Sequence, residues 1–185
     1  VVPGNGTMIT EAVRGNGAIL INREGKRFGN EMATRDVMSA AVLAQTGKTA
    51  YIFFDQGVRD SLKAINGYVK NGFTTEGATI EELAGKLNIP ADALKATVEQ
   101  YNKYVVAKKD PEFGRNPNSF TRSYKNAEGK QVNEDTQLVK GPSYAIEIAP
   151  AVHHTMGGIK INPKTEVLTR EGTPIPGLYA AGEVT

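Results

Sequence analysis

The stretch Ala18-Ile-Leu-Ile-Asn-Arg-Glu-Gly-Lys-Arg-Phe-Gly-Asn-Glu-Met-Ala-Thr-Arg-Asp36 decides the expected fold. Its first half predicts a β-hairpin, because an apolar run is followed by the turn Arg23-Glu-Gly-Lys26 and by Arg27-Phe28. Its second half predicts a helix, which Thr34 caps at its start and which runs to about Gln45. The residues expected on the buried face of this helix are Val37, Ala41 and Ala44. A strand pattern so close to a helix pattern predicts a mixed, α+β domain.

Three more helices are expected downstream, each from its own start signal. Asp55 follows the apolar run Tyr51–Phe54, a candidate buried strand, and could cap a short helix to about Ile65. Thr79-Ile-Glu-Glu82 matches a capping box and opens the second helix. Pro90 fits the first turn of the third. The apolar residues of that third helix recur at helical spacing, at Leu94, Val98, Tyr101 and Val105.

Residues 110–185 differ in composition from the rest of the chain. Residues 110–142 are rich in Asn, Ser, Lys and Pro, and we expect a long loop there. Short strand patterns separated by Pro and Gly follow, at 144–148, 158–162, 166–168 and 178–181. The expected organisation is therefore an α+β domain over residues 1–143 and a strand-rich segment of another domain over residues 144–185.

The composition argues against several kinds of site and partner. The 185 residues contain no cysteine, which excludes disulfides, thiolate metal sites, iron–sulfur clusters and covalent haem attachment within them. Only two histidines are present, and they are adjacent, so no metal site is expected. The formal net charge is +2 and the basic residues are scattered, so nucleic acid is not an expected partner. The apolar runs are far shorter than the ~20 residues of a membrane span.

Two local groups in the first third contain candidate functional residues. In the stretch from Met8 to Gly17, Glu11 and Arg14 lie three residues apart, a spacing typical of a surface ion pair and compatible with a proton relay. Arg35 falls in the first turn of a helix, where a cation is disfavoured by the helix dipole. Local conflicts of this kind are typical of functional sites. The alternative for Arg35 is a structural salt bridge to Asp36 or Glu31.

Two further groups lie near the end of the chain. The stretch from Pro150 to Gly158 contains His153 and His154 before two glycines, where backbone can approach a ligand closely. These histidines could donate to an anion or to a flavin edge, and the alternative is a histidine satisfied within its loop. The apolar run that begins at Pro176 ends in Gly-Glu, and a carboxylate there, Glu183, is well placed to bind ribose hydroxyls.

Together and in this order, the four groups resemble one family, the flavocytochrome-c-type soluble fumarate reductases. This group includes urocanate reductases and other FAD-dependent 2-enoate reductases. The resemblance covers nearly the whole chain and weakens over residues 110–142, which are longer than usual. The matching stretches are Thr10-Glu-Ala-Val-Arg-Gly-Asn-Gly17, Lys26-Arg-Phe-Gly-Asn-Glu31 with Thr34-Arg-Asp36, His153-His-Thr-Met-Gly-Gly158 and Gly177-Leu-Tyr-Ala-Ala-Gly-Glu-Val-Thr185.

The resemblance implies a fold and a reaction. Residues 1–143 would be the capping domain of a fumarate-reductase/succinate-dehydrogenase-type flavoprotein, and residues 144–185 the start of its return into the FAD-binding domain. Such enzymes reduce the C=C bond of fumarate to succinate by adding a hydride from FAD to one alkene carbon and a proton to the other. The same chemistry on urocanate or another 2-enoate is the nearest alternative.

Roles for individual residues also follow from the resemblance. It makes Arg35 the proton donor, with Glu11 and Arg14 as the relay that re-protonates it. It assigns Thr10, Glu11 and His153 to the substrate carboxylates. The expected FAD contacts are His154 and Glu183.

A guanidinium has a pKa above about 12, so its use as an acid needs a physical reason. Once hydride has been added, the substrate resembles a carbanion, which is basic enough to take a proton from a weak but well-oriented acid. Arginine also brings positive charge toward the negative charge that develops on the substrate. A carboxylate within hydrogen-bonding reach is then needed to restore the lost proton.

Much of the flavoenzyme is expected to lie outside these 185 residues, including the glycine-rich dinucleotide-binding segment, a substrate-binding histidine and a carboxylate-binding arginine. Both ends of the chain are read as cuts within a longer protein, whose partners would be a small dicarboxylate or related enoate and an electron-donor module with haem or flavin. Family analogy suggests the periplasm or cell envelope and leaves the cytoplasm open. A rival interpretation makes the chain an excised, non-catalytic capping module with no activity by itself.

Overall fold

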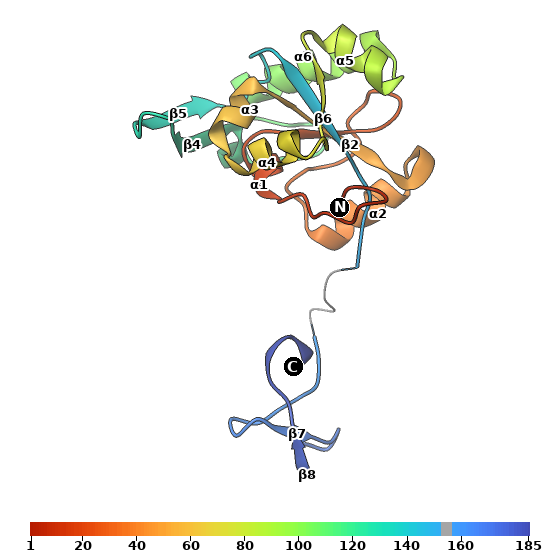
Figure 1. Cartoon of the computed structure of the whole chain (residues 1–185), viewed down its shortest axis with the longest axis vertical. Coiled ribbons are helices and arrows are strands. Elements are labelled where there is room, and N and C mark those ends of the chain that lie inside the picture. The colour runs from red at the N-terminus through yellow and green to blue at the C-terminus, as the bar shows by residue number, and fades with distance from the viewer. Residues whose placement is uncertain (153–156) are drawn as a thin grey trace. The chain divides into compact units, whose positions relative to one another are not determined.

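The computed structural model describes residues 1–152 and 157–185 of the chain. Contacts divide the chain into two compact units, Val1–Pro150 and Ala151–Thr185 (Figure 1). The first unit contains helices and a central sheet, and the second contains a small two-stranded sheet. The expected mixture of helix and sheet is confirmed.

A four-stranded antiparallel sheet forms the centre of the first unit, in the order β1-β2-β6-β3. All six residues of β2 are buried, because its apolar side chains meet core on both faces. Phe54 on β2 stacks on Tyr144 of β6, with ring centroids 5.3 Å apart. The strands are β1 (Ile19–Ile21), β2 (Ala50–Asp55), β3 (Thr75–Gly77) and β6 (Ser143–Ile148).

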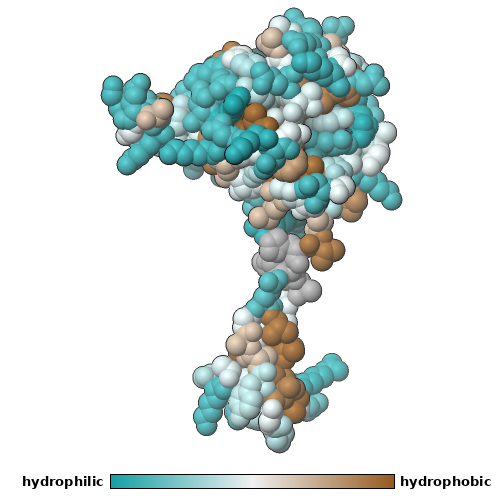
Figure 2. Space-filling view, viewed as in Figure 1, coloured by the Kyte–Doolittle hydropathy of each residue, from teal (hydrophilic) through white to brown (hydrophobic). Residues whose placement is uncertain are grey.

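Helices in the first unit pack their apolar residues against this sheet to form one continuous core. They are α1 (Ala12–Gly15), α2 (Arg35–Leu43), α3 (Gln56–Ser61), α4 (Ala64–Lys70), α5 (Ile80–Leu87) and α6 (Ala91–Ala107), with the 3-10 turns η1 (Thr46–Lys48) and η2 (Pro117–Phe120). On the face shown in Figure 2, hydrophilic residues cover most of this unit.

Several expected local structures are confirmed. The hydroxyl of Thr79 accepts a hydrogen bond from the backbone N–H of Glu82 at 3.1 Å, as a helix N-cap does. The carboxylate of Asp55 likewise accepts from Val58 N–H at 3.0 Å and caps α3, although that helix ends at Ser61 rather than near Ile65. The predicted face of α6 is the one that is buried. The expected hairpin after β1 is reduced to a single bridge, Ile21 to Arg27, because β1 pairs mainly with β2.

The predicted buried face of α2 is wrong in part. Met38 and Val42 are buried and Ala41 packs partly buried against the core, whereas Val37 is 53% exposed and Ala44 is exposed as well. The helix also ends at Leu43 rather than near Gln45. Small and apolar residues occur on every side of this helix, so their spacing alone does not distinguish one face from another.

The expected long loop over residues 110–142 is also wrong in part. It contains an antiparallel hairpin of β4 (Thr121–Lys125) and β5 (Gln131–Asp135), which projects at the left of Figure 1. The side chain of Asn126 accepts hydrogen bonds from the backbone N–H groups of Glu128 and Lys130 and builds the turn. Most side chains of the two strands are polar, so they lack the apolar alternation by which a strand is recognised.

The second unit consists of β7 (Glu166–Leu168) and β8 (Pro174–Tyr179), paired antiparallel, and the 3-10 turn η3 (Gly182–Val184). The strand expected over 158–162 is only one bridge, Ile161 to Val167. Val167 is buried, whereas five large apolar residues among those described in this unit are exposed, which are Val152, Ile159, Leu178, Tyr179 and Val184.

The division between the units falls after Pro150 because β6 pairs along its whole length with β2. The domain boundary expected from the sequence, after residue 143, would separate the first residue of β6, Ser143, from the rest of the strand. The assignment of residues 1–143 to a capping domain and 144–185 to an FAD-binding domain stays a prediction. Within the described residues, no helix has the length and apolarity to cross a membrane, and no cluster of three potential metal ligands occurs.

Candidate active site

Arg35 is the first residue of α2 and follows Thr34, whose extended backbone starts the helix. The side chain of Arg35 is 63% exposed and forms a forked pair with the carboxylate of Glu11. Its Nε donates to Oε1 at 2.8 Å and its Nη2 donates to Oε2 at 3.5 Å. The hydrogen bond to Glu11 raises the pKa of Arg35 above its ordinary value, so the guanidinium is charged.

Glu11 immediately precedes α1 and lies between two arginines. Besides the bonds from Arg35, its Oε1 lies 3.3 Å from Nη2 of Arg14. The hydrogen bond from Arg35 lowers the pKa of Glu11 most, burial opposes this, and the charge of Arg14 lowers it further. The net direction is downward, so the carboxylate is ionised at neutral pH.

Arg14 lies deeper in the first unit than Arg35, with only 14% of its side chain exposed. Its Nη1 donates to the backbone carbonyl of Glu31 at 2.9 Å. Burial lowers the pKa of Arg14, the charges of Glu11 and Glu31 raise it, and the net direction is downward. Arg35, Glu11 and Arg14 thus form a continuous row of donors and acceptors from solvent toward the interior.

Thr10 adjoins this row in sequence. Its backbone N–H donates to the hydroxyl of Tyr68 on α4 at 3.1 Å, and its own hydroxyl accepts from Ala12 N–H at 3.3 Å. These bonds hold the backbone just before Glu11. The carboxylate of Glu11 is engaged by both arginines, which leaves its backbone as the part that could meet another anion.

The sequence left open a salt bridge from Arg35 to Asp36 or Glu31. In the structure Arg35 binds Glu11 instead. Glu31 is 1% exposed and binds Arg27 and Arg115, at 2.8 Å and 3.2 Å.

This buried ionic cluster of Arg27, Glu31, Asp110 and Arg115 was not predicted. Nη2 of Arg27 bonds both Glu31 and Asp110 at 2.9 Å, and no side chain of the cluster is more than 3% exposed. The spacing of Arg27 and Glu31, four residues apart, was the only local signal. Arg115 lies 84 residues from Glu31 in sequence, a distance that no local pattern covers.

Apolar side chains flank the arginine row in sequence. Met8 is 62% exposed, Met32 is 45% exposed and Val37 is 53% exposed. Each lies within three residues of Thr10, Glu11 or Arg35 in the chain.

The expected flavin contacts are in the second unit. Glu183 is exposed in η3, after the carboxyl end of β8, and follows Gly182, which has a φ of 82° and open space around its Cα. An exposed carboxylate beside accessible backbone has the chemistry to accept hydrogen bonds from ribose hydroxyls. His153 and His154 lie outside the described residues, so their predicted roles stay predictions.

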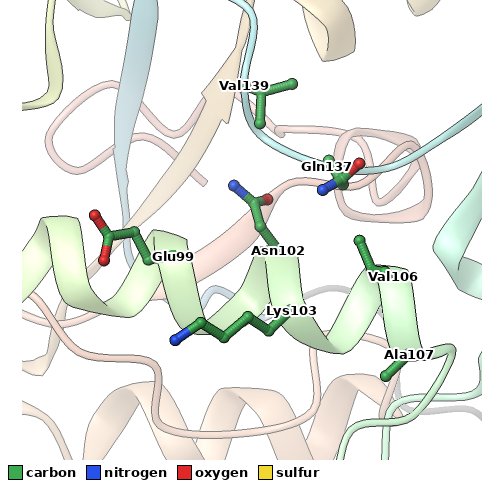
Figure 3. A pocket seen from close by; sticks show the side chains of 7 residues that line it. All are labelled: Glu99, Asn102, Lys103, Val106, Ala107, Gln137 and Val139. Atoms are coloured by element: carbon green, nitrogen blue, oxygen red, sulfur yellow. The ribbon is translucent and has the colours of Figure 1, made fainter.

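A shallow hollow of about 520 Å³ lies along α6 (Figure 3). Figure 3 shows Asn102 and Val106 on the helix and Gln137 and Val139 on the segment that faces it. The amide of Asn102 is occupied, since it both donates to and accepts from the backbone of Leu138. The hollow contains none of the residues predicted to carry function.

Comparison with known proteins places this geometry in a family. The FAD binding domain family matches residues 1–185. A fumarate reductase (cytochrome) of Shewanella frigidimarina is 49% identical over 180 residues, which cover 97% of this chain and 29% of that protein. A urocanate reductase of Eggerthella lenta is 37% identical over 175 residues, which cover 91% of this chain and 26% of that protein.

Solved structures agree with the sequence comparisons. The open conformation of a flavocytochrome c3 fumarate reductase matches with a TM-score of 0.71 and 38% identity, over 100% of this chain and 30% of that one. The chain therefore spans about three tenths of the length of the relatives that it matches. It belongs to the FAD binding domain family, and its similarity within that family is to fumarate reductases and related 2-enoate reductases.

Proposed function

We propose that this chain is the capping domain and part of the FAD-binding domain of a flavoenzyme that reduces the C=C bond of a 2-enoate. The names of the relatives support fumarate as the first substrate to test and urocanate as the second. Residues 1–143 would form the cap, and residues 144–185 would return to the flavin. The complete enzyme would receive electrons from a haem or flavin module, in keeping with the cytochrome named in one relative.

FAD is the cofactor of the family, and its reduced form would supply the hydride for this reaction. The accessible carboxylate of Glu183 and the open backbone at Gly182 fit a contact with its ribose. His154 is a second proposed contact. The 185 residues contain no Gly-x-Gly-x-x-Gly stretch, so they would bind only part of the cofactor.

The forked ion pair between Arg35 and Glu11 is the observation that carries the proposal. Arg35 uses Nε and Nη2 for Glu11, and within the described part of the chain its Nη1 has no hydrogen-bond partner. We propose that Arg35 directs this nitrogen at the alkene carbon that becomes basic, and gives it a proton. Until the proton has moved, the positive charge of Arg35 stabilises the negative charge that develops on the substrate.

Arg35 would regain its proton through Glu11 and Arg14. Glu11 is within hydrogen-bonding distance of Arg35 and is also adjacent to Arg14, so it can accept a proton from Arg14 and return it to Arg35. Burial lowers the pKa of Arg14, which makes it a better donor to a carboxylate than an arginine in water. The proton therefore moves along groups that are already paired, and Arg14, with 14% of its side chain exposed, would regain its own proton from water.

Substrate binding is assigned to the same face. Thr10 and the backbone of Glu11 would contact one carboxylate of the substrate, and His153 would contact another. The carboxylate of Glu11 itself would repel the substrate, but its two arginine partners neutralise that charge.

Substitution of Arg35 in the complete flavoenzyme tests the proposal. Arg35→Ala is expected to lower kcat by about 10²–10⁴-fold, the usual contribution of a general acid, while the flavin is still reduced and substrate still binds. Arg35→Lys keeps a charge and a proton but loses the forked geometry, so it should recover only part of the rate.

The matched control is Arg23→Ala. Arg23 also forms an ion pair with a glutamate, Glu147, at 2.6 Å and is partly exposed. Its loss is expected to leave kcat within about twofold of the original, as for most surface substitutions. Equal kcat values for Arg35→Ala and Arg23→Ala would show that Arg35 takes no part in the reaction.

A further inference from the structure

Arg115 is a buried arginine that lies outside the row of Arg35, Glu11 and Arg14 but touches its inner end. Its side chain is fully buried. Its Nη2 donates to the backbone carbonyl of Arg14 at 2.9 Å, and its Nη1 donates to Glu31 Oε2 at 3.2 Å and to the carbonyl of Ala18 at 3.3 Å. Its Nε donates to the hydroxyl of Ser119 at 3.1 Å. Every nitrogen of this guanidinium therefore has a partner.

Aromatic rings fix the plane of the Arg115 guanidinium. Its central carbon lies 5.5 Å from the ring centroid of Tyr101 and 5.9 Å from that of Phe120. Removing a guanidinium from water is costly unless its donors are satisfied and its charge is paired. A fully buried arginine with fixed partners on all three nitrogens thus has little freedom to move.

Glu31 connects Arg115 to the side chain of Arg14. The carboxylate of Glu31 accepts from Arg115, from Arg27 and from Leu20 N–H, so the residue is held from several directions. Its backbone carbonyl accepts from Nη1 of Arg14 at 2.9 Å. Arg14 is therefore anchored twice, through its own carbonyl by Arg115 and through its guanidinium by Glu31. Both anchors meet at the buried ion pair between Arg115 and Glu31.

We propose that Arg115, with Glu31, is a positioning residue for proton return: it fixes the Arg14 guanidinium against Glu11 and so sets the rate at which Arg35 is re-protonated. This inference rests on the proposed function. A shift of Arg14 by about 1 Å would lengthen its 3.3 Å contact with Glu11 beyond hydrogen-bonding range, and misplacement of that size can slow catalysis by ~10²-fold. Burial lowers the pKa of Arg14, and the positive charge of Arg115 lowers it as well, against the effects of Glu11 and Glu31.

The first test is Arg115→Lys in the complete flavoenzyme. A lysine ammonium is a point charge on a flexible stem and cannot reach the carbonyls of Arg14 and Ala18 and the carboxylate of Glu31 together. We expect kcat to fall about 10–10²-fold with KM changed less than about threefold, because the substrate contacts are untouched. The solvent deuterium isotope effect on kcat should rise, because proton return becomes rate-limiting.

Arg122→Lys is the matched control. Arg122 is as buried as Arg115, with 1% of its side chain exposed, and belongs to the same stretch of chain. It too donates to a backbone carbonyl next to α1, that of Asn16 at 3.1 Å, but touches neither Arg14 nor Glu31. Arg122→Lys should leave kcat within about twofold of the original. This should hold even if it lowers the free energy of unfolding as much as Arg115→Lys does.

A second measurement separates positioning from general support of the fold. If Arg115 acts through Arg14, Arg115→Lys should have no further effect on kcat in an enzyme that already carries Arg14→Gln, since coupled residues are not additive. A residue that only stabilises the fold would slow both backgrounds by the same factor. Should Arg115→Lys fail to fold or retain flavin, Glu31→Gln, which keeps the shape and removes the charge of the partner, takes its place in the same comparison.

The outcomes separate the two proposals. If Arg35→Ala and Arg14→Gln slow turnover but Arg115→Lys does not, or if it slows both backgrounds equally, the positioning role is wrong and the proposed function stands. If Arg35→Ala and Arg14→Gln leave kcat unchanged, the proposed function is wrong, and the positioning role, which depends on it, is wrong as well. A loss of kcat in Arg115→Lys that vanishes in the Arg14→Gln background supports both.

Discussion

Asp110 is a carboxylate that stays charged with none of its side chain exposed. Burial raises the pKa of Asp110, but the hydrogen bond from Arg27 and those from the backbone N–H groups of Phe113 and Glu112 lower it more. The net direction is below the ordinary value of 3.8. Because its pKa is lower in the folded chain, this group stabilises the fold above about pH 3.8, and that contribution is lost as pH falls through the folded pKa.

Asp110→Asn is therefore expected to lower the free energy of unfolding of this chain by about 2–4 kcal/mol near neutral pH, because Arg27 loses a charged partner in a buried place. The difference from the original chain should shrink as pH falls below 3.8. Urea unfolding over a pH series measures it. Glu128→Gln, which removes a 71%-exposed carboxylate, is the control and should change stability by less than about 0.5 kcal/mol. A difference that stays constant down to pH 2 would show that the charge of Asp110 contributes nothing.

At the scale of the element, α6 presents two neighbouring valines to opposite environments. Val105 is fully buried, whereas Val106 is 65% exposed beside the hollow of Figure 3. A helix turns by about 100° per residue, so adjacent positions cannot share one face. The helix ends at Ala107, because the left-handed backbone of the next residue, Lys108, stops the helical pattern.

Val105→Ala should lower the free energy of unfolding by about 1.5–3 kcal/mol, from lost burial of two methyl groups and from the cavity that remains. Val106→Ala makes the same chemical change on the exposed face and should be neutral or slightly stabilising, because alanine has the higher helix propensity. Urea unfolding of the two variants side by side is the measurement. Equal losses would mean that the buried face of α6 is misassigned.

At the scale of the whole molecule, the 185 residues span about three tenths of the relatives that they match. Their proposed flavin contacts belong to the second unit, whose large apolar residues are mostly exposed. The proposed proton donor, Arg35, belongs to the first unit, and its guanidinium is open to solvent. A complete reaction would need both units together with the rest of the flavin site.

We expect the purified 185-residue chain to retain no FAD and to be colourless. The reason is that the sequence contains no glycine-rich dinucleotide loop, which supplies most of the phosphate contacts in flavoproteins of this kind. Visible absorbance after desalting measures bound flavin, and oxidation of a reduced viologen dye by fumarate measures turnover. The complete flavoenzyme, purified in the same way, is the positive control. A yellow, active preparation of homogeneous 185-residue chain would contradict the expectation.

Local sequence was sufficient for those features whose interactions lie within a few residues. The caps at Asp55 and Thr79 and the buried face of α6 are of this kind, since each depends on neighbours one helical turn away. The order of the four motifs also indicated the family, to which the chain belongs. Arg35 was singled out by the same local means, as a cation at the wrong end of a helix.

Only the tertiary structure decided which charges meet. Arg35 binds Glu11, 24 residues away, rather than its neighbour Asp36, and Arg115 reaches the carbonyl of Arg14 across 101 residues. Such partners depend on where distant parts of the chain cross, and a buried arginine leaves no periodic signal in the sequence. The hairpin of β4 and β5 was not predicted for a related reason. Its strands are polar and are stabilised by pairing with each other, so the sequence lacks the apolar alternation that indicates a strand.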